Sequence, residues 1–428
     1  MIQSLTIKNF LSFKEEVTFS FEATNDKKLE DYHIVEVAKG IRLLKLCIVN
    51  GANASGKSNL LGAFEFLKQF WFISKENKMD KTGVIPFLLD SETPDKPTNF
   101  KLNFYVNGSK YSYSLELNQN IVISEKLDFY PGVQPANVFT RTIGGNISKI
   151  EYGNKIKISQ VAKEKIAISC LTNMSVFSAY TKVNTDIPEI EHVLIWMRKQ
   201  FMNIVTPNMQ HLVQYAEQTI LKDQNIKREI LAYLQKADFN IFNIDVVDVQ
   251  KTLPDFLIDG IAQDKSIPSS EIERIKNEKT ITIKEIDFLH KIVNSQGEEE
   301  QFTLNKNYQS EGTLRALGIG AVILQAIERD AFLCIDEIES KLHPRLIEFV
   351  LEQFLRNSIQ SQLLVATHYD GLFDEDDMFR KDNFWFTEKK QNGSTDLYSL
   401  SDFRALNRIS SIQKAYKLGK FGAIPNIS

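Results

Sequence analysis

A single octapeptide, GANASGKS at residues 51–58, limits the folds open to this chain. The dense apolar run IRLLKLCIVN leads into it, and residues 58–75 after it carry helical periodicity, so the sequence predicts strand, loop and helix in that order. Its two glycines let the backbone curl until amide groups face a phosphate, and the helix N-terminus adds partial positive charge. We therefore predict a nucleotide-phosphate loop beside a buried, largely parallel sheet.

The loop side chains have separate chemical tasks in this interpretation. Lys57 is the point charge for the β- and γ-phosphates, and the Ser58 hydroxyl is a ligand for Mg²⁺. The other predicted nucleotide-binding positions of the loop are Gly51, Asn53, Ser55 and Gly56. The expected ligands are ATP and Mg²⁺.

A second apolar run, FLCI at residues 332–335, ends in two adjacent acids. A buried strand that stops at carboxylates suits the ligand edge of such a sheet. Asp336 would hold Mg²⁺, and Glu337 would polarise the attacking water as a general base. Because strands often end in acids, this pair indicates a nucleotide site only in combination with the phosphate loop.

Two further segments each leave two interpretations open. Ser310, Gly312 and Thr313 stand at the start of a predicted helix, where they could bind an anion or only cap the helix. His368 ends the apolar strand 362–367, at the edge where open α/β sheets bind ligands, or it is a structural histidine.

The rest of the sequence predicts antiparallel strands, helices and loops. Alternating apolar residues over 87–130, with Asn-Gly at 107–108, predict antiparallel strands joined by a hairpin. Residues 187–236 carry helical periodicity, whereas 240–300 are charged and are expected to contain flexible loops.

The order of these motifs resembles the ABC-type ATPases of the SMC, RecF and OLD group. The resemblance is carried by IKNFLSF, GANASGKSNLL and DEIESKLHP, and KLGKFGAIPNI is similar to short single-head ATPases of bacterial defence and abortive-infection operons. It implies an α/β fold: an ABC-type head with mixed and parallel sheet flanked by helices, an antiparallel β subdomain and a mainly helical insertion. The expected parts are residues 1–184, 185–300 and 301–428, with the insertion in the middle.

The resemblance also implies roles for residues in matching motifs. They are Gly56, Lys57, Ser58 and Asn59 as Walker A, Ser310, Gly312 and Thr313 as the signature, Asp336 and Glu337 as Walker B, Ser340 as the start of the D-loop, and His368 as the switch histidine. Lys57, Glu337 and His368 would be catalytic, and the signature would reach ATP held by another copy. Two departures concern coupling: no Q-loop glutamine can be placed, and Leu342-His343 replaces the Leu-Asp of transporter heads.

The function that we expect is ATP hydrolysis by the sensor or motor subunit of a bacterial antiphage system. The copies would meet as a dimer or larger oligomer through ATP, and a separate effector such as a nuclease would act with them. Alternatives are a RecF-like ATPase that binds DNA directly, using the basic cluster Arg404, Arg408, Lys414, Lys417 and Lys420, or an ATP-dependent scaffold. The long insertion disfavours a transporter ATPase.

The composition excludes few classes of function. The net charge of −4, from 51 basic and 55 acidic residues, neither demands nor excludes nucleic acid, because binding needs only a local basic stripe. Three cysteines without paired spacing predict no disulfide framework and no zinc site. We expect no signal peptide, no membrane contact and a cytoplasmic protein.

Overall fold

The computed structural model describes residues 1–145, 147–207, 212–237, 240–261 and 269–425. The chain divides into two compact units. The first, here the head unit, is Met1–Met209 with Gln325–Ser428, and the second, the insert unit, is Gln210–Leu324.

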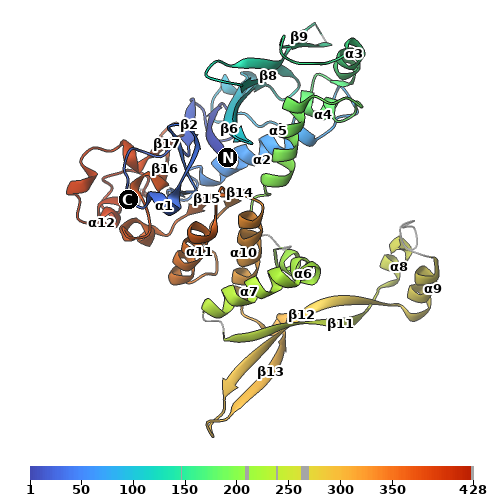
Figure 1. Cartoon of the computed structure of the whole chain (residues 1–428), viewed down its shortest axis with the longest axis vertical. Helices are drawn as coiled ribbons and strands as arrows, with labels where there is room; N and C mark the ends of the chain where they lie inside the picture. The colour runs from blue at the N-terminus through green and yellow to red at the C-terminus, as the bar shows by residue number, and fades with distance from the viewer. Residues whose placement is uncertain (146, 208–211, 238–239, 262–268, 426–428) are drawn as a thin grey trace. The chain divides into compact units, whose positions relative to one another are not determined.

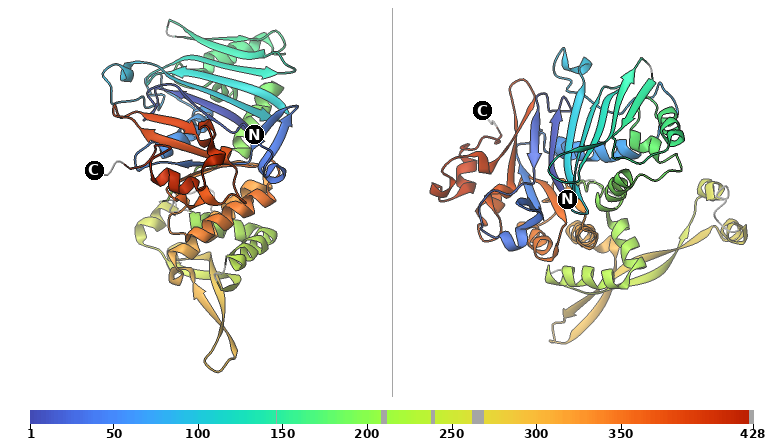
Figure 2. Two further views of the ribbon diagram at one scale, coloured as in Figure 1. Left: turned by 90° about the vertical axis from the view of Figure 1, so that its left-hand side faces the viewer. Right: turned by 45° about the horizontal axis from the view of Figure 1, so that its top comes forward.

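The head unit contains two large sheets and a small two-stranded one. Its strands are β1 (Ile2–Lys8), β2 (Val17–Ser20), β3 (Ile34–Ala38), β4 (Ile41–Leu44), β5 (Leu46–Asn50), β6 (Thr98–Val106), β7 (Ser109–Leu117), β8 (Val122–Tyr130), β9 (Ala136–Gly144), β10 (Ile147–Tyr152), β14 (Phe332–Ile335), β15 (Gln362–Thr367), β16 (Phe384–Lys389) and β17 (Thr395–Ser399). Its helices are α1 (Glu30–His33), α2 (Lys57–Phe72), α3 (Gln160–Ser169), α4 (Val176–Tyr180), α5 (Pro188–Gln200), α11 (Pro344–Asn357) and α12 (Ile412–Lys417). Figures 1 and 2 show these elements.

One large sheet is antiparallel throughout and has the order β10-β9-β8-β7-β6-β1-β2. Its β6–β7 hairpin turns at Asn107 and Gly108, with φ of 48° and 76°. Both residues take the left-handed conformation that an Asn-Gly hairpin turn requires. The predicted antiparallel β subdomain and its hairpin are confirmed.

The other large sheet has the order β14-β15-β5-β16-β17. Its first four strands run parallel, and β17 runs antiparallel to β16. All five residues of β5 are buried, as expected for a central parallel strand. Because β5, β14 and β15 run the same way, their carboxyl ends meet at one edge, which carries the predicted site.

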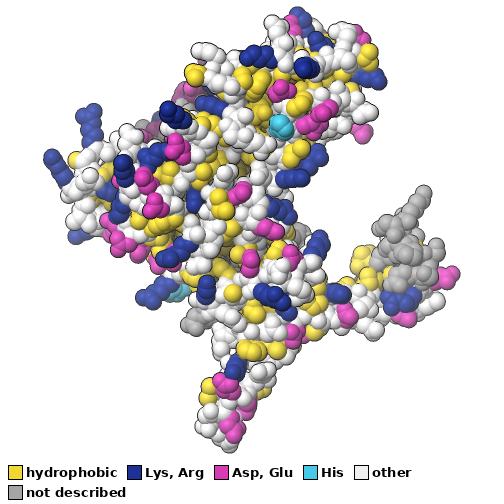
Figure 3. Space-filling model, viewed as in Figure 1, with side chains coloured by type: hydrophobic (Ala, Val, Ile, Leu, Met, Phe, Trp, Pro, Cys, Tyr) yellow, Lys and Arg dark blue, Asp and Glu magenta, His cyan; other side chains and the backbone are white. Residues whose placement is uncertain are grey.

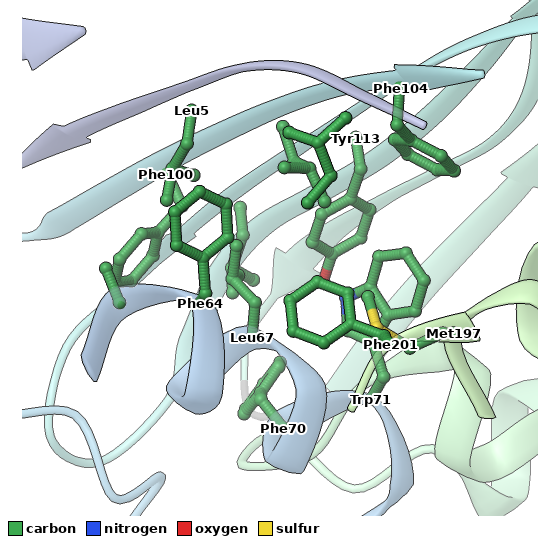
Figure 4. Close-up of a cluster of buried hydrophobic side chains, with 14 of the residues drawn as sticks. Leu5, Phe64, Leu67, Phe70, Trp71, Phe100, Phe104, Tyr113, Met197 and Phe201 are labelled. Atoms are coloured by element: carbon green, nitrogen blue, oxygen red, sulfur yellow. The ribbon is translucent and has the colours of Figure 1, made fainter. Parts of the chain in front are cut away.

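Helix α2 packs between these two sheets. Phe64 meets Phe332 of β14 with ring centroids 4.9 Å apart, and Trp71 meets Tyr113 of β7 at 4.9 Å. Figure 4 shows this cluster, with side chains of α2 facing the antiparallel sheet. The position of α2 within the core explains why the loop in front of it is rigidly held.

The insert unit combines helices with a sheet, whereas the sequence predicts mainly helices over 185–300. Its elements are α6 (Leu212–Lys222), α7 (Gln224–Lys236), β11 (Ile241–Thr252), α8 (Asp255–Ile261), α9 (Ser269–Glu278), β12 (Thr280–Val293), β13 (Glu299–Asn305) and α10 (Glu311–Glu328), which passes into the head unit. The sheet order is β11-β12-β13, antiparallel. Most side chains of these strands are at least partly exposed, so charges interrupt the alternation that reveals half-buried strands.

The unit boundaries also differ from the predicted ones. The insert unit runs from 210 to 324, so it leaves α5 in the head and takes in the predicted signature at Ser310. Helix α5 belongs to the head because Trp196 stacks on Phe104 of β6, with ring centroids 4.6 Å apart. Among the described residues, no helix is long and apolar enough to cross a membrane.

Candidate functional site

The loop at residues 51–56 joins the buried strand β5 to α2, as predicted. Gly56 begins the helix with a φ of 111°, a value that L-residues rarely adopt. A Cβ on Gly51 would lie 2.5 Å from the carbonyl oxygen of Thr387, and one on Gly56 would lie 2.8 Å from Cγ2 of Thr395. Conformation demands glycine at residue 56, and close packing demands it at both positions.

Lys57 turns back over this loop. Its Nζ donates to the carbonyl oxygens of Gly51 at 2.9 Å and Ala52 at 3.1 Å, and lies 3.0 Å from Nε2 of His368. Burial lowers the pKa of Lys57 to about 8, although the nearby carboxylates oppose this shift. The ammonium group therefore lies in the concave side of the loop, where a phosphate would meet it.

Asp336 and Glu337 follow β14, at the same edge of the sheet. Asp336 is only 9% exposed, and its Oδ1 has no hydrogen-bond partner among the described residues. An unsatisfied buried carboxylate oxygen is costly, and a cation would satisfy it. Glu337 is exposed and has a φ of 46°, so the chain turns sharply directly after the strand.

Magnesium fits this set of donors. The Asp336 carboxylate and the exposed Ser58 hydroxyl are hard oxygen ligands, and Mg²⁺ takes only one or two protein ligands beside water and substrate phosphate. No group of three or more His, Cys, Asp or Glu side chains that could hold a metal occurs within the described ranges.

Glu339 connects the acidic segment that follows β14 to the segment that contains His368. The sequence analysis did not identify this residue. Its Oε2 accepts from the Thr367 hydroxyl at 2.6 Å, and its Oε1 accepts from the backbone amide of His368 at 2.6 Å. Burial, and then the charge of Lys57, lowers the pKa of His368, so a neutral imidazole can accept from that ammonium. The only signal for Glu339 in the sequence was its position as a further acidic residue after Asp336 and Glu337 in the segment DEIE.

Three hydroxyl side chains that the sequence did not single out support the loop. Ser55 Oγ lies 2.6 Å from Thr387 Oγ1, and Thr395 Oγ1 donates to the Ser55 carbonyl at 2.7 Å. Ser12, in the turn between β1 and β2, accepts at 2.7 Å from Thr395 Oγ1 and at 2.7 Å from the amide of Asn59. Ser55 and Asn59 therefore have structural partners, and nothing local in the sequence pairs Ser55 with Thr387 and Thr395, which lie over 300 positions away.

A cavity of about 1190 Å³ opens beside the loop. It is lined by Gly51–Asn53 and His368, by the end of β16 and by the C-terminal turn. Phe421 anchors that turn by stacking on Phe386, with ring centroids 6.0 Å apart and planes at 14°. The cavity is larger than the roughly 300–1,000 Å³ of most small-ligand pockets, so a nucleotide has room there.

The predicted signature lies in the insert unit. Ser310 precedes α10, and its Oγ accepts from the Thr313 amide at 3.0 Å and lies 2.8 Å from Thr313 Oγ1. The helix-cap interpretation is therefore confirmed for Ser310. Anion binding by Ser310, Gly312 and Thr313 stays a prediction, because a capping hydroxyl can also stand beside a ligand at a helix N-terminus.

Residues 47–374 match the protein family described as "AAA domain, putative AbiEii toxin, Type IV TA system". The match spans most of the chain and includes the phosphate loop, Ser310–Thr313, Asp336 with Glu337, and His368, and the chain belongs to this family. The family match assigns an AAA domain to the chain, and the loop, the acidic strand end and the sheet order agree with a P-loop nucleotide-binding fold. The predicted α/β class and family resemblance are confirmed.

Two solved structures are similar to this chain at low identity and with TM-scores below 0.5. The SMC head domain from Thermotoga maritima has 13% identity and a TM-score of 0.42, covering 93% of this chain and 98% of its own. The structure titled "Crystal structure of the SmcHead bound to the C-winged helix domain of ScpA" has 12% identity and a TM-score of 0.46, covering 97% and 99%. No curated protein matches the chain.

Proposed function

We propose that this protein binds Mg·ATP at the loop 51–56 and hydrolyses it. The observation that carries the proposal is the convergence of Lys57 Nζ, the buried and unpartnered Asp336 Oδ1 and His368 at one sheet edge. A cation, a metal-seeking carboxylate and a neutral imidazole at a glycine loop suit phosphoryl transfer to water.

Each side chain has a step in this mechanism. Lys57 exchanges its loop carbonyls for β- and γ-phosphate oxygens, while loop amides hold the phosphates in place. Asp336 and Ser58 would hold Mg²⁺, which neutralises developing phosphate charge. Glu337, exposed at the strand end, accepts the proton of the attacking water. His368 donates an imidazole N–H to the γ-phosphate, and Glu339 holds its backbone amide.

Steady-state phosphate release with and without Mg²⁺ tests the proposal. We expect Lys57→Ala to lose both ATP binding and turnover, and Glu337→Gln to keep binding but lose turnover by a factor on the order of 100 or more. Lys78→Ala, an exposed lysine beyond α2, is the matched control and should behave as wild type. Equal turnover in Glu337→Gln and wild type would refute the assignment of the base.

We further propose that two copies share each site, with Ser310 of one copy at the γ-phosphate of the other. Co-expressing Lys57→Ala with Ser310→Arg tests it, because one of the two mixed sites would then be intact. Each variant alone should be inactive, and the mixture should recover up to about half of the turnover per mixed dimer. Full activity of Ser310→Arg alone would show that Ser310 is only a helix cap.

We propose a defence role, with a separate effector, as the biological setting. The family description, which names a toxin of a type IV toxin–antitoxin system, supports it. Plaque counts on cells carrying the native operon test it: protection should disappear with Lys57→Ala and with deletion of the neighbouring effector gene. Unchanged plaque counts across all three strains would refute the role.

Direct DNA binding is less well supported by the structure. The basic C-terminal cluster is interleaved with acids: Lys417 lies 3.4 Å from Asp370, and Asp374 accepts from Ser411 at 2.6 Å. Such pairing weakens the local positive field that phosphate contacts need. Binding to a duplex with a steep salt dependence that Lys414→Glu abolishes would restore this alternative; slow turnover that only sustains assembly would favour the scaffold.

A further inference from the structure

Strand β13 (Glu299–Asn305) is an open edge of the insert-unit sheet. It pairs with β12 on one side and has no second neighbour among the strands that the structure describes. Six of its seven residues are exposed. Figure 1 shows β13 in a hairpin with the end of β12. An unpaired row of amides and carbonyls is a template for another strand.

Two large apolar side chains stand on one face of this edge. Phe302 is 47% exposed and Leu304 is 39% exposed, and they lie opposite His290 and Phe288 of β12. Figure 3 shows hydrophobic and acidic side chains together on the β12–β13 hairpin. Edge strands are usually protected by charges on the apolar face or by a covering element. Here Glu300 is the one charged residue on that face of β13, and no described element covers Phe302 and Leu304, which both stay exposed.

The hydrogen-bond pattern shows which residues point toward the open edge. The Asn294 amide donates to the Glu298 carbonyl at 2.9 Å, next to the pair Val293 and Glu299. The direction of the backbone amide and carbonyl groups alternates along an antiparallel strand. The even-numbered residues of β13 therefore bond to β12, and the backbone groups of the odd-numbered residues face outward. Thr303 therefore presents its amide and carbonyl to an incoming strand.

We propose that β13 pairs antiparallel with β13 of a second copy of this chain, with Thr303 opposite Thr303. In this register the outward amides of both copies bond in pairs. Phe302 of each copy then lies opposite Leu304 of the other, and Glu300 opposite Lys306. Apolar and opposite-charge neighbours stabilise a sheet, and a threonine pair at the twofold axis is also favourable.

Other registers with the same outward amides fit less well. Shifting the axis to Phe302 pairs two phenylalanines but sets Glu300 against Leu304, and an axis at Gln301 sets Glu300 against Phe302. Only the Thr303 axis keeps both apolar side chains against apolar partners and puts the Glu300 carboxylate beside an ammonium group. Lys306 already contacts Glu217 at 2.7 Å, so the second copy would extend an existing ion pair.

This contact goes beyond the proposed ATPase function, because nothing in it depends on nucleotide. It would join the two insert units to each other, whereas shared ATP would join the head unit of one copy to Ser310 in the insert unit of the other. A copy pair that persists without ATP would raise the effective concentration of heads for each other. The Lys57→Ala variant must therefore keep it even if ATP binding is lost.

Disulfide capture tests the register. Residues that face each other in a hydrogen-bonded antiparallel pair have Cα atoms about 5.5 Å apart, within disulfide range. Thr303→Cys should form a covalent dimer under mild oxidation without ATP, whereas Gln301→Cys, which would face Asn305, is the matched control and should not. The native cysteines 47, 170 and 334 are buried and should not interfere. Absence of the Thr303→Cys dimer would overturn the proposed pairing.

The mass of the nucleotide-free protein tests the contact itself. We expect two chains for wild type and for Lys57→Ala, and one chain for Phe302→Lys. Val293→Lys, which replaces another exposed apolar residue of the same sheet away from the open edge, is the control and should remain at two chains. A single-chain mass for nucleotide-free wild type would overturn the proposal, and this result would leave the ATPase function untouched.

Discussion

The head unit contains a fully buried ion pair, and no ion pair described in the insert unit is buried as completely. In the head, the ion pair of Arg141 and Glu125 has both side chains 0% exposed, whereas the insert-unit pair of Lys279 and Asp255 has them 56% and 78% exposed. The head also buries its aromatic cluster between two sheets, but the insert unit extends strands whose two faces are largely solvated. The difference indicates a densely packed head unit and an insert unit whose strands are largely exposed.

Removing one member of each ion pair should show this difference most strongly. Arg141→Met leaves Glu125 buried among Tyr113, Ser175 and the amide of Val176, and should cost about 3–5 kcal/mol of unfolding free energy. Lys279→Met in the insert unit should cost less than about 1 kcal/mol. Burial already raises the pKa of Glu125, so protonation limits the loss.

Urea unfolding followed by tryptophan fluorescence measures the head, and circular dichroism in the same titration follows both units. The three tryptophans, 71, 196 and 385, all belong to the head unit. Equal midpoints for Arg141→Met and wild type would contradict the view that buried polar contacts organise the head.

A buried histidine should make the head sensitive to acid. His33 is fully buried, its Nε2 lies 2.8 Å from the Met378 carbonyl, and burial lowers its pKa to about 4. Because the unfolded chain gains the proton near pH 6.5 and the folded one only near 4, stability present above pH 6.5 is lost as the pH falls toward 4. The loss should be about 3 kcal/mol.

The same fluorescence experiment from pH 7 to pH 4 checks this expectation. His33→Gln should show a smaller fall in stability over that range, and His290→Gln on β12 of the insert unit should follow wild type. A fall that is unchanged in His33→Gln would assign the acid sensitivity to other groups.

The hydroxyl pair of Thr387 and Ser55 tests whether the head unit positions the loop 51–56. Thr387→Val removes the partner of Ser55 Oγ, which lies 2.6 Å away, with little change of shape. We expect Mg·ATP to bind about five-fold more weakly, corresponding to about 1 kcal/mol. Thr282→Val, an exposed threonine of β12, should leave ATP affinity unchanged. Equal affinities for both variants would show that the hydroxyl contact does not position the loop.

The smallest expected effect is proton uptake. Because the Lys57 pKa is about 8, roughly half of the free protein is uncharged there at pH 8, and bound phosphate should raise that pKa. Binding should therefore take up about half a proton at pH 8, and affinity should fall as the pH rises above 8. Calorimetry in buffers of different ionisation enthalpy measures the uptake. Lys57→Arg, which stays charged, should show none, and equal uptake in both proteins would contradict the Lys57 assignment.

The head was more predictable than the insert unit for a physical reason. Fully buried parallel strands such as β5 appear in sequence as continuous apolar runs, and the phosphate loop between strand and helix is local in the chain. The strands β11 and β12 are mostly partly exposed and carry charges, which hide their alternation, so the sequence predicts a mainly helical insertion with flexible loops in its charged stretches. The unit boundaries were missed because α5 looks like the helices that follow it.

The sequence by itself determined the chemistry of the site: glycine loop, Lys57, Asp336 with Glu337, and His368, each at the end of an apolar strand or the start of a helix. Only the tertiary structure decided what supports these residues. Thr387, Thr395 and Glu339 reach the site through strands that come together when the sheet forms. Hydrogen bonds between segments that are distant in sequence leave no local pattern, because their geometry exists only in the folded chain.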